Sequence, residues 1–243
     1  MLNSYYSYVK TNETYLDNAK HATYAGITIK TGILLFITIA VGIGVSFLLP
    51  YIAPEKVSVF IYSLMGAGIV GMISALFGRF FPKIAMLCGF IYSVAMGAML
   101  GTIITLVNFY YPGAGTLSIS ATVITFAIML VLYAFGIIRN GSIIRMIAFG
   151  IIASVLALFI FDLIYILATG GGSDYGIYIA IQALLLIYGV ITLTFNFAEA
   201  EAVVKYGASK ESEWSVALGM EVSLIYIYIY ILRIVIFIMG NRR

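Results

Sequence analysis

The residues whose types could carry chemistry are a few acidic, amide and basic side chains set in apolar surroundings. Asn196 and Glu199 lie three residues apart at the end of one apolar stretch, so on a helix they share a face. Glu221 lies some two turns inside the next apolar stretch, and Arg79 closes an earlier one. Because burying a charge without a partner is costly, these positions are where a charge-dependent function is expected.

Two acids near one another would suit two kinds of site. The polar connection after Glu199 brings it to the same end of the molecule as Glu221. Two carboxylates in a low-dielectric site cannot both ionise cheaply, so one would keep its proton near neutral pH and act as a proton-sensitive element. Ionised together, they could share a hard cation such as Ca²⁺ through oxygen ligands, with Arg79 as a movable counter-charge. The alternative is that Glu199 is solvated and Glu221 pairs with a lysine.

Enzyme chemistry is not indicated. The chain has one histidine, one cysteine and no H-E-x-x-H motif, which excludes the usual metal-hydrolase and Cys–His arrangements. It has no P-loop and no dinucleotide fingerprint. We therefore expect no enzyme, no cofactor and no assigned metal-ligand set. The net charge of +3 is spread thinly among loops, so no nucleic-acid partner is expected.

Composition places the chain in a membrane. Its residues are 63% hydrophobic and 9% charged, whereas soluble domains carry about 25% charged residues. Seven apolar segments each reach the roughly 20 residues that a spanning helix needs. We therefore expect an all-α integral membrane protein, a seven-transmembrane-helix bundle over residues 26–243 in contact with the lipid bilayer, after a polar tail at residues 1–25. The expected spans are 31–52, 57–77, 84–107, 116–138, 146–168, 176–197 and 215–238.

Lysine and arginine positions predict an orientation. By the positive-inside rule, the N-terminal tail and the even-numbered connections lie in the cytoplasm, because the odd-numbered connections hold only Lys56. Arg242 and Arg243 would then lie outside, against the rule. The positive residues on the cytoplasmic side are Lys10, Lys20, Lys30, Arg79, Lys83, Arg139, Arg145, Lys205 and Lys210.

A small-residue motif, Gly97 and Gly101, has the spacing that allows close helix contact in lipid. It predicts either a dimer face or ordinary packing within the bundle. The sequence assigns no oligomeric state. Cys88, the only cysteine, lies in an apolar run, which favours a packed thiol.

Several short motifs occur in a characteristic order. The run EAEAVVKYGASKESEW (Glu199–Trp214) is followed by an apolar helix that ends YILR (Tyr230–Arg233). Upstream are IKTGILL (Ile29–Leu35), FPKIAMLCGFIYS…MGAMLG (Phe81–Gly101) and LYAFGIIR (Leu132–Arg139). Together they resemble the Bax inhibitor-1 family, the transmembrane Bax-inhibitor-motif superfamily, in its bacterial YccA-like branch. The resemblance covers the chain from about Gly26 onward.

The resemblance implies a fold and a function. It implies six helices in two layers around a central seventh. Members have been described as pH-sensitive Ca²⁺ leak channels, in which two aspartates on the sixth and seventh helices share a proton and an arginine at the end of the second helix latches the gate. YccA-like members are also associated with the membrane protease FtsH. The implied location is the bacterial cytoplasmic (cell inner) membrane.

This chain departs from the family pattern at the sensor. Asn196, Phe197 and Ala198 stand where the branch reads roughly D-F-D, and the acid expected in the seventh span falls near Ser223. Glu221 lies two residues earlier, so that Glu199 and Glu221 would replace the pair after a small shift in register.

The remaining matches complete the functional expectation. Arg79 matches the latch, and Glu201 matches the family's loop acid. We expect a pH-sensitive Ca²⁺ leak. Its ion- or proton-sensing residues are Glu199, Glu221, Asn196 and Ser223, and Arg79 is the gate. The alternative is a non-transporting regulator of a membrane protease or stress response.

Overall fold

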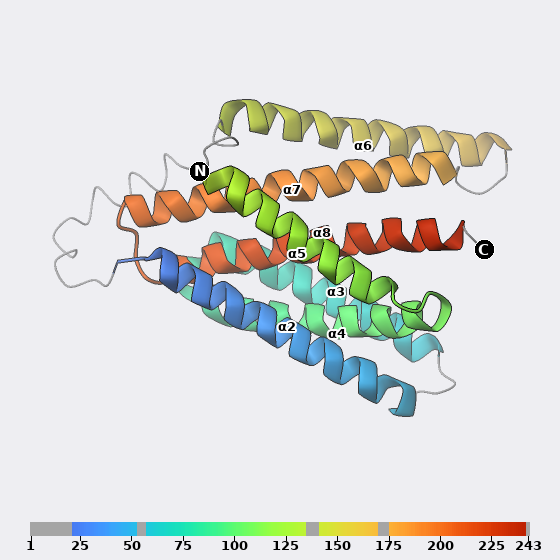
Figure 1. Cartoon of the computed structure of the whole chain (residues 1–243), viewed down its shortest axis with the longest axis horizontal. Coiled ribbons are helices and arrows are strands. Elements are labelled where there is room, and N and C mark those ends of the chain that lie inside the picture. The colour runs from blue at the N-terminus through green and yellow to red at the C-terminus, as the bar shows by residue number, and fades with distance from the viewer. Residues whose placement is uncertain (1–20, 53–56, 135–140, 170–174, 242–243) are drawn as a thin grey trace.

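The protein is an all-α bundle. The computed structural model describes residues 21–52, 57–134, 141–169 and 175–241 (Figure 1). The described part of each of the seven expected spans falls on one helix, which confirms the predicted fold class. In the described part, the helices are α2 (Tyr24–Ile52), α3 (Val57–Phe80), α4 (Ala85–Tyr110), α5 (Ala114–Ala134), α6 (Gly141–Thr169), α7 (Tyr175–Lys205) and α8 (Ser212–Gly240), with a short 3₁₀ helix, η2 (Pro82–Ile84), between α3 and α4.

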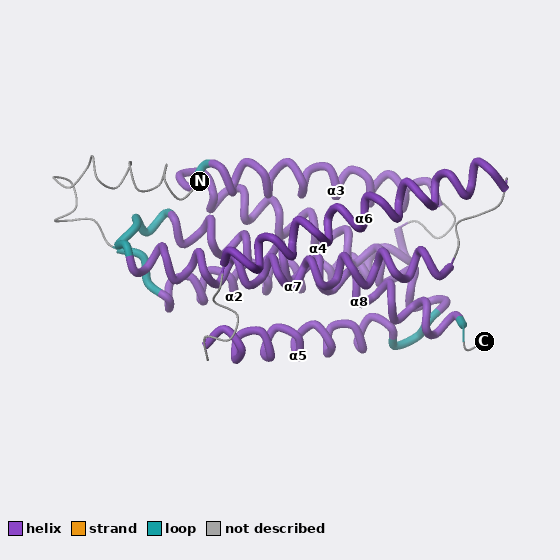
Figure 2. Tube along the Cα trace, turned by 90° about the horizontal axis from the view of Figure 1, so that it is seen from above, coloured by secondary structure: helices purple, strands orange, loops and turns teal. Residues whose placement is uncertain are grey.

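Helix α8 lies at the centre of the bundle. It packs against α2, α3, α4, α5 and α7, whereas α6 packs on α7. Seen from above, α3 and α5 lie on opposite sides of the molecule, with α8 between them (Figure 2). The buried polar side chains of α8, such as Glu221 and Ser223, therefore face other helices.

The outward faces of the helices are apolar. Phe36, Phe47 and Phe149 are each at least 70% exposed, which would be costly in water but suits lipid. Over the described residues, five helices are long and apolar enough to cross a membrane, and two shorter apolar runs, Leu64–Phe80 and Ile147–Asp162, lie in α3 and α6. The chain is a multi-pass membrane protein.

Two helix ends differ from the predicted spans. Helix α7 continues to Lys205, so the predicted connection at Ala198–Trp214 is wrong in its first half. Alanine, glutamate and lysine are good helix formers, and they carry the helix on. Gly207, with φ +64°, then ends it: the Gly207 and Ala208 amides donate to Val204 and Val203 carbonyls, a Schellman cap.

Near the N-terminus, α2 begins at Tyr24 rather than at residue 31, where the first span was expected to begin. Lys30, which precedes the predicted first span, therefore belongs to a helix. Residues 1–20 of the tail, Lys56, Arg139, Arg242 and Arg243 lie outside the described residues.

The small-residue motif packs within the bundle. A Cβ atom on Gly97 would lie 2.6 Å from the Thr38 carbonyl oxygen, and one on Gly101 would collide with the Gly42 carbonyl oxygen. The motif thus lets α4 approach α2 closely, which confirms ordinary packing rather than a dimer face. Cys88 is buried, as predicted.

Candidate functional site: two polar faces of helix α8

Helix α8 presents polar groups on two sides. Glu221 and Ser223 are two residues apart, and an α-helix turns about 200° over two residues. Both side chains are 0% exposed. They therefore point to opposite neighbours, and the two sides are described in turn.

The first side is a latch formed by charged and amide groups. Arg79, in the last turn of α3, forms an ion pair with Glu199 of α7, with 2.6 Å between Nη2 and Oε2. The same nitrogen donates to Asn196 Oδ1 at 3.0 Å, and Nη1 donates to the Ser215 carbonyl at 3.4 Å. The Arg79 and Glu199 side chains are each 37% exposed, so this pair lies at the edge of the bundle.

Asn196 continues the latch into the core. It is 1% exposed, and its Nδ2 donates to the Gly219 carbonyl at 2.8 Å and to Ser223 Oγ at 2.7 Å. Gly219 is needed for this approach, since a Cβ there would overlap the Arg79 guanidinium and lie 2.9 Å from Asn196 Oδ1. The latch, defined as Glu199, Arg79, Asn196 and Ser223, ties α3, α7 and α8 together.

The second side is a buried acid. Glu221 Oε1 accepts hydrogen bonds from Thr38 Oγ1 of α2 at 2.6 Å and from Ser93 Oγ of α4 at 2.8 Å. Its other oxygen, Oε2, has no hydrogen-bond partner in the described part of the chain, and neither do the buried hydroxyls of Tyr92 and Tyr228. The carboxyl group is thus enclosed among neutral partners.

The five expected site residues fall into two groups. Four of them form the latch, whereas Glu221 is bound by α2 and α4 instead. Glu199 and Glu221 share no partner among the contacts of the described residues. Glu221 also forms no ion pair with a lysine or arginine in the described ranges.

A third charged group was missed from the sequence. Glu213, in the first turn of α8, is 0% exposed and lies 2.6 Å from Lys30 Nζ. Its Oε1 accepts the Thr23 amide at 2.8 Å, and Lys30 donates to the Lys210 carbonyl at 3.0 Å. The Ala22 amide adds a bond to the α7–α8 connection. This group fixes the start of α2 against the start of α8.

The reason for each omission is physical. Lys30 falls before the predicted first span, where a lysine is expected to be solvated and to need no partner. The run KESEW contained the one available signal, an acid beside the chain's only tryptophan at a helix start. Thr38 and Ser93 resemble hydroxyls that bond their own helix, as Ser93 also does to the Gly89 carbonyl.

Chemically, the latch and the buried acid differ in what they can do. The latch contains one acid with a cation beside it, plus an amide and a hydroxyl that do not titrate. Glu221, by contrast, has no counter-charge in the part of the chain that the structure describes. No cluster of three or more histidine, cysteine, aspartate or glutamate side chains that could hold a metal occurs within the described residues.

A comparison of the sequence with models of known families gives the family of the chain. The sequence model described as Bax inhibitor 1 like matches residues 3–240. The chain belongs to the Bax inhibitor 1-like family. No curated protein and no solved structure matches it. The Bax inhibitor 1-like family is not known as an enzyme family, and membership accounts for the multi-pass apolar helices.

Proposed function

We propose that this Bax inhibitor 1-like protein is a cation leak pathway, for Ca²⁺ in particular, and that the protonation of Glu221 controls it. The observation that carries the proposal is the complete burial of Glu221 on the central helix, where, among the described residues, one of its oxygens has no partner and no cation pairs with it. Ionisable groups inside a membrane are expensive and usually mark ion or proton pathways.

The direction of control follows from the surroundings of Glu221. A protonated carboxyl is tolerated among the Thr38 and Ser93 hydroxyls, so the described bundle corresponds to the closed, protonated form. Losing the proton leaves a buried charge without a counter-ion, which is strongly unfavourable. A form in which water or a cation reaches Glu221 relieves this cost. In this proposal the leak therefore opens as pH rises.

The latch supplies the gate. Arg79 and Asn196 join α3 and α7 to α8 at the Gly219 and Ser223 positions, within one turn of Glu221. A movement of α8 that admits water to Glu221 would stretch these bonds. Because Asn196 and Ser223 do not titrate, the proton sensor of this chain is placed at Glu221 rather than at the α7–α8 contact.

A regulator that transports nothing is the second candidate. The observation in its favour is that Glu221 is sealed and satisfied on one oxygen by two hydroxyls. In that case the exposed residues of the α7–α8 connection, such as Tyr206 and Lys210, would contact a membrane protease such as FtsH. For both candidates we propose the bacterial cytoplasmic membrane with the N-terminus inside.

The deciding experiment is Ca²⁺ flux into liposomes that hold the purified protein, from pH 6 to pH 8. We expect flux to rise with pH in the parent and to lose its pH response in Glu221→Gln. Asp162→Asn is the matched control, since it removes an acid from α6, which packs on α7 and away from Glu221. Parent flux no greater than that of empty liposomes at every pH would refute the leak and favour the regulator.

A further inference from the structure

A basic pocket lies at the end of the bundle where α2, η2 and the α7–α8 connection meet. It encloses about 420 Å³ and is lined by Lys30, Lys83 and Lys210, together with Met86 and Trp214. Lys30 is paired with Glu213, but Lys83 and Lys210 are exposed and have no acid partner within the described residues. Two uncompensated lysines beside a tryptophan are typical of a membrane interface.

The pocket also contains one opposing charge. Glu211 lines it and is exposed. Its carboxylate offsets part of the field of the two free lysines. The pocket should therefore attract a single anionic group, and removal of the Glu211 charge should strengthen that attraction.

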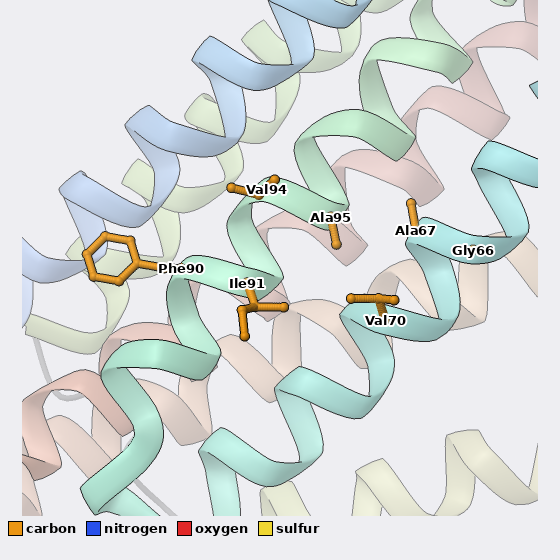
Figure 3. Close-up of a pocket in the computed structure, with 7 residues that line it drawn as sticks. All are labelled: Gly66, Ala67, Val70, Phe90, Ile91, Val94 and Ala95. Atoms are coloured by element: carbon orange, nitrogen blue, oxygen red, sulfur yellow. The ribbon is translucent and has the colours of Figure 1, made fainter.

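An apolar groove lies between α3 and α4. It encloses about 460 Å³, and Ala67 and Val70 of α3 face Ala95 of α4 across it (Figure 3). Gly66 also lines it, and a Cβ atom at Gly66 would meet no atom within 4 Å. The groove is thus open at Gly66 and lies on a surface that faces lipid.

The pocket and the groove are neighbours, because an aromatic ring that lines one contacts an aromatic ring that lines the other. Phe90 lines the groove, and its ring lies 5.6 Å from that of Trp214, which lines the basic pocket. Met86, Phe90 and Val94 follow at four-residue intervals, so they share one face of α4 over about 12 Å. A molecule with an anionic head and an apolar chain could occupy both sites at once.

We propose that these two sites bind one anionic phospholipid, with its phosphate between Lys83 and Lys210 and one acyl chain in the groove at Gly66. Basic pockets at the ends of membrane helices attract anionic headgroups, and each lysine contributes about fivefold to affinity. The lipid would bridge η2, α4 and the start of α8. This inference stands independently of the proposed leak.

The headgroup is tested by native mass spectrometry of the full chain in detergent. We expect phosphatidylglycerol to bind more tightly than phosphatidylcholine with the same acyl chains. The Lys83→Gln and Lys210→Gln double variant should weaken binding roughly 30-fold, and Glu211→Gln should strengthen it about fivefold. Lys205→Gln is the matched control, because it removes a positive charge from the end of α7, outside the pocket.

The acyl chain is tested by filling the groove. Gly66→Leu should weaken binding, whereas Gly150→Leu should not, although both glycines are exposed on helices with no atom near their Cβ positions. Glycerol 3-phosphate, which lacks acyl chains, should fail to displace the lipid at equal concentration. Equal binding of both lipids, equal loss with Lys205→Gln, no effect of Gly66→Leu, or displacement by glycerol 3-phosphate would each overturn the proposal.

Discussion

Replacing Glu221 with methionine should stabilise the protein, whereas the same change at Glu213 should destabilise it. The two glutamates lie on one helix, both 0% exposed, eight residues and about 12 Å apart. They differ in their partners. Glu213 has Lys30 at 2.6 Å and the Thr23 amide, whereas Glu221 has hydroxyl groups alone among the described contacts.

The expected magnitudes follow from that difference. A buried polar atom without a hydrogen-bond partner costs about 1–3 kcal/mol, and Glu221 Oε2 has no partner among the described residues, so an apolar side chain of similar size should stabilise by about that amount. At Glu221 the released hydroxyls keep other acceptors: the Gly89 carbonyl lies 2.9 Å from Ser93 Oγ, and the Ser93 carbonyl lies 3.3 Å from Thr38 Oγ1. At Glu213 the change strands Lys30, which is 12% exposed, and breaking a buried pair in this way costs about 3–5 kcal/mol.

Cys88 supplies the assay. It is the only cysteine and is buried, so a thiol-reactive fluorophore reports unfolding of the detergent-solubilised protein during heating. At about 2–4 °C per kcal/mol for a chain of this size, Glu221→Met should raise the Tm by roughly 2–12 °C and Glu213→Met should lower it by roughly 6–20 °C.

Two results would refute this reasoning. A Tm for Glu221→Met well below that of the parent would mean that the hydroxyl–carboxyl bonds hold the bundle together, and that Glu221 is structural. An unchanged Tm for Glu213→Met would mean that the Lys30 pair is not formed. Adding Lys30→Met to Glu213→Met should recover part of the loss, because it removes the stranded charge.

Further predictions concern the helix contacts and the latch. Gly97→Ala should lower the Tm by a few degrees, because overpacking costs about 1–3 kcal/mol. Gly44→Ala on α2, whose Cβ would meet no atom within 4 Å, should leave the Tm equal or slightly higher. Thermal unfolding followed by the labelling of Cys88 measures both. Asn196→Ala removes the bonds to Arg79, Gly219 and Ser223, so it should loosen the latch and raise Ca²⁺ flux in liposomes at pH 6; flux equal to that of the parent would contradict the gating role. Gly207→Ala should cost about 1 kcal/mol through its positive φ, again measured as a fall in Tm.

The helices were predictable because each one is a long apolar run, and lipid leaves the backbone no alternative to internal hydrogen bonding. The residues at which the helices begin and end were less predictable. Hydropathy falls at Ala198, so an argument from the free energy of transfer into lipid ends the membrane span there. The backbone nevertheless continues as helix to Lys205, because no helix-breaking residue occurs before Gly207. The lipid boundary and the helix boundary are different properties, and only the first is expressed as hydropathy.

The site was predictable in part. Resemblance to a family pointed to Arg79, Asn196 and Ser223, and these residues do contact one another in order. The partners of Glu221 were not predictable, since Thr38 and Ser93 lie 183 and 128 residues away in sequence and look like ordinary helix hydroxyls. Long-range pairs of this kind depend on how the helices are rotated, which one sequence does not reveal.

The face of α8 on which Glu221 lies decides which helices it contacts, although Glu221 is only two residues from Ser223 of the latch. A shift of two residues on a strand would keep a side chain on the same face, but on α8 it turns Glu221 about 200° away from Ser223. Glu221 therefore cannot take the place of an acid at the α7–α8 contact. In the proposed function, the α2–α4 side of α8 is instead the side that responds to protons, while Asn196 binds the opposite side. Because one rigid helix carries both groups, a displacement of α8 that relieves an ionised Glu221 must also strain the Asn196 bonds to Gly219 and Ser223.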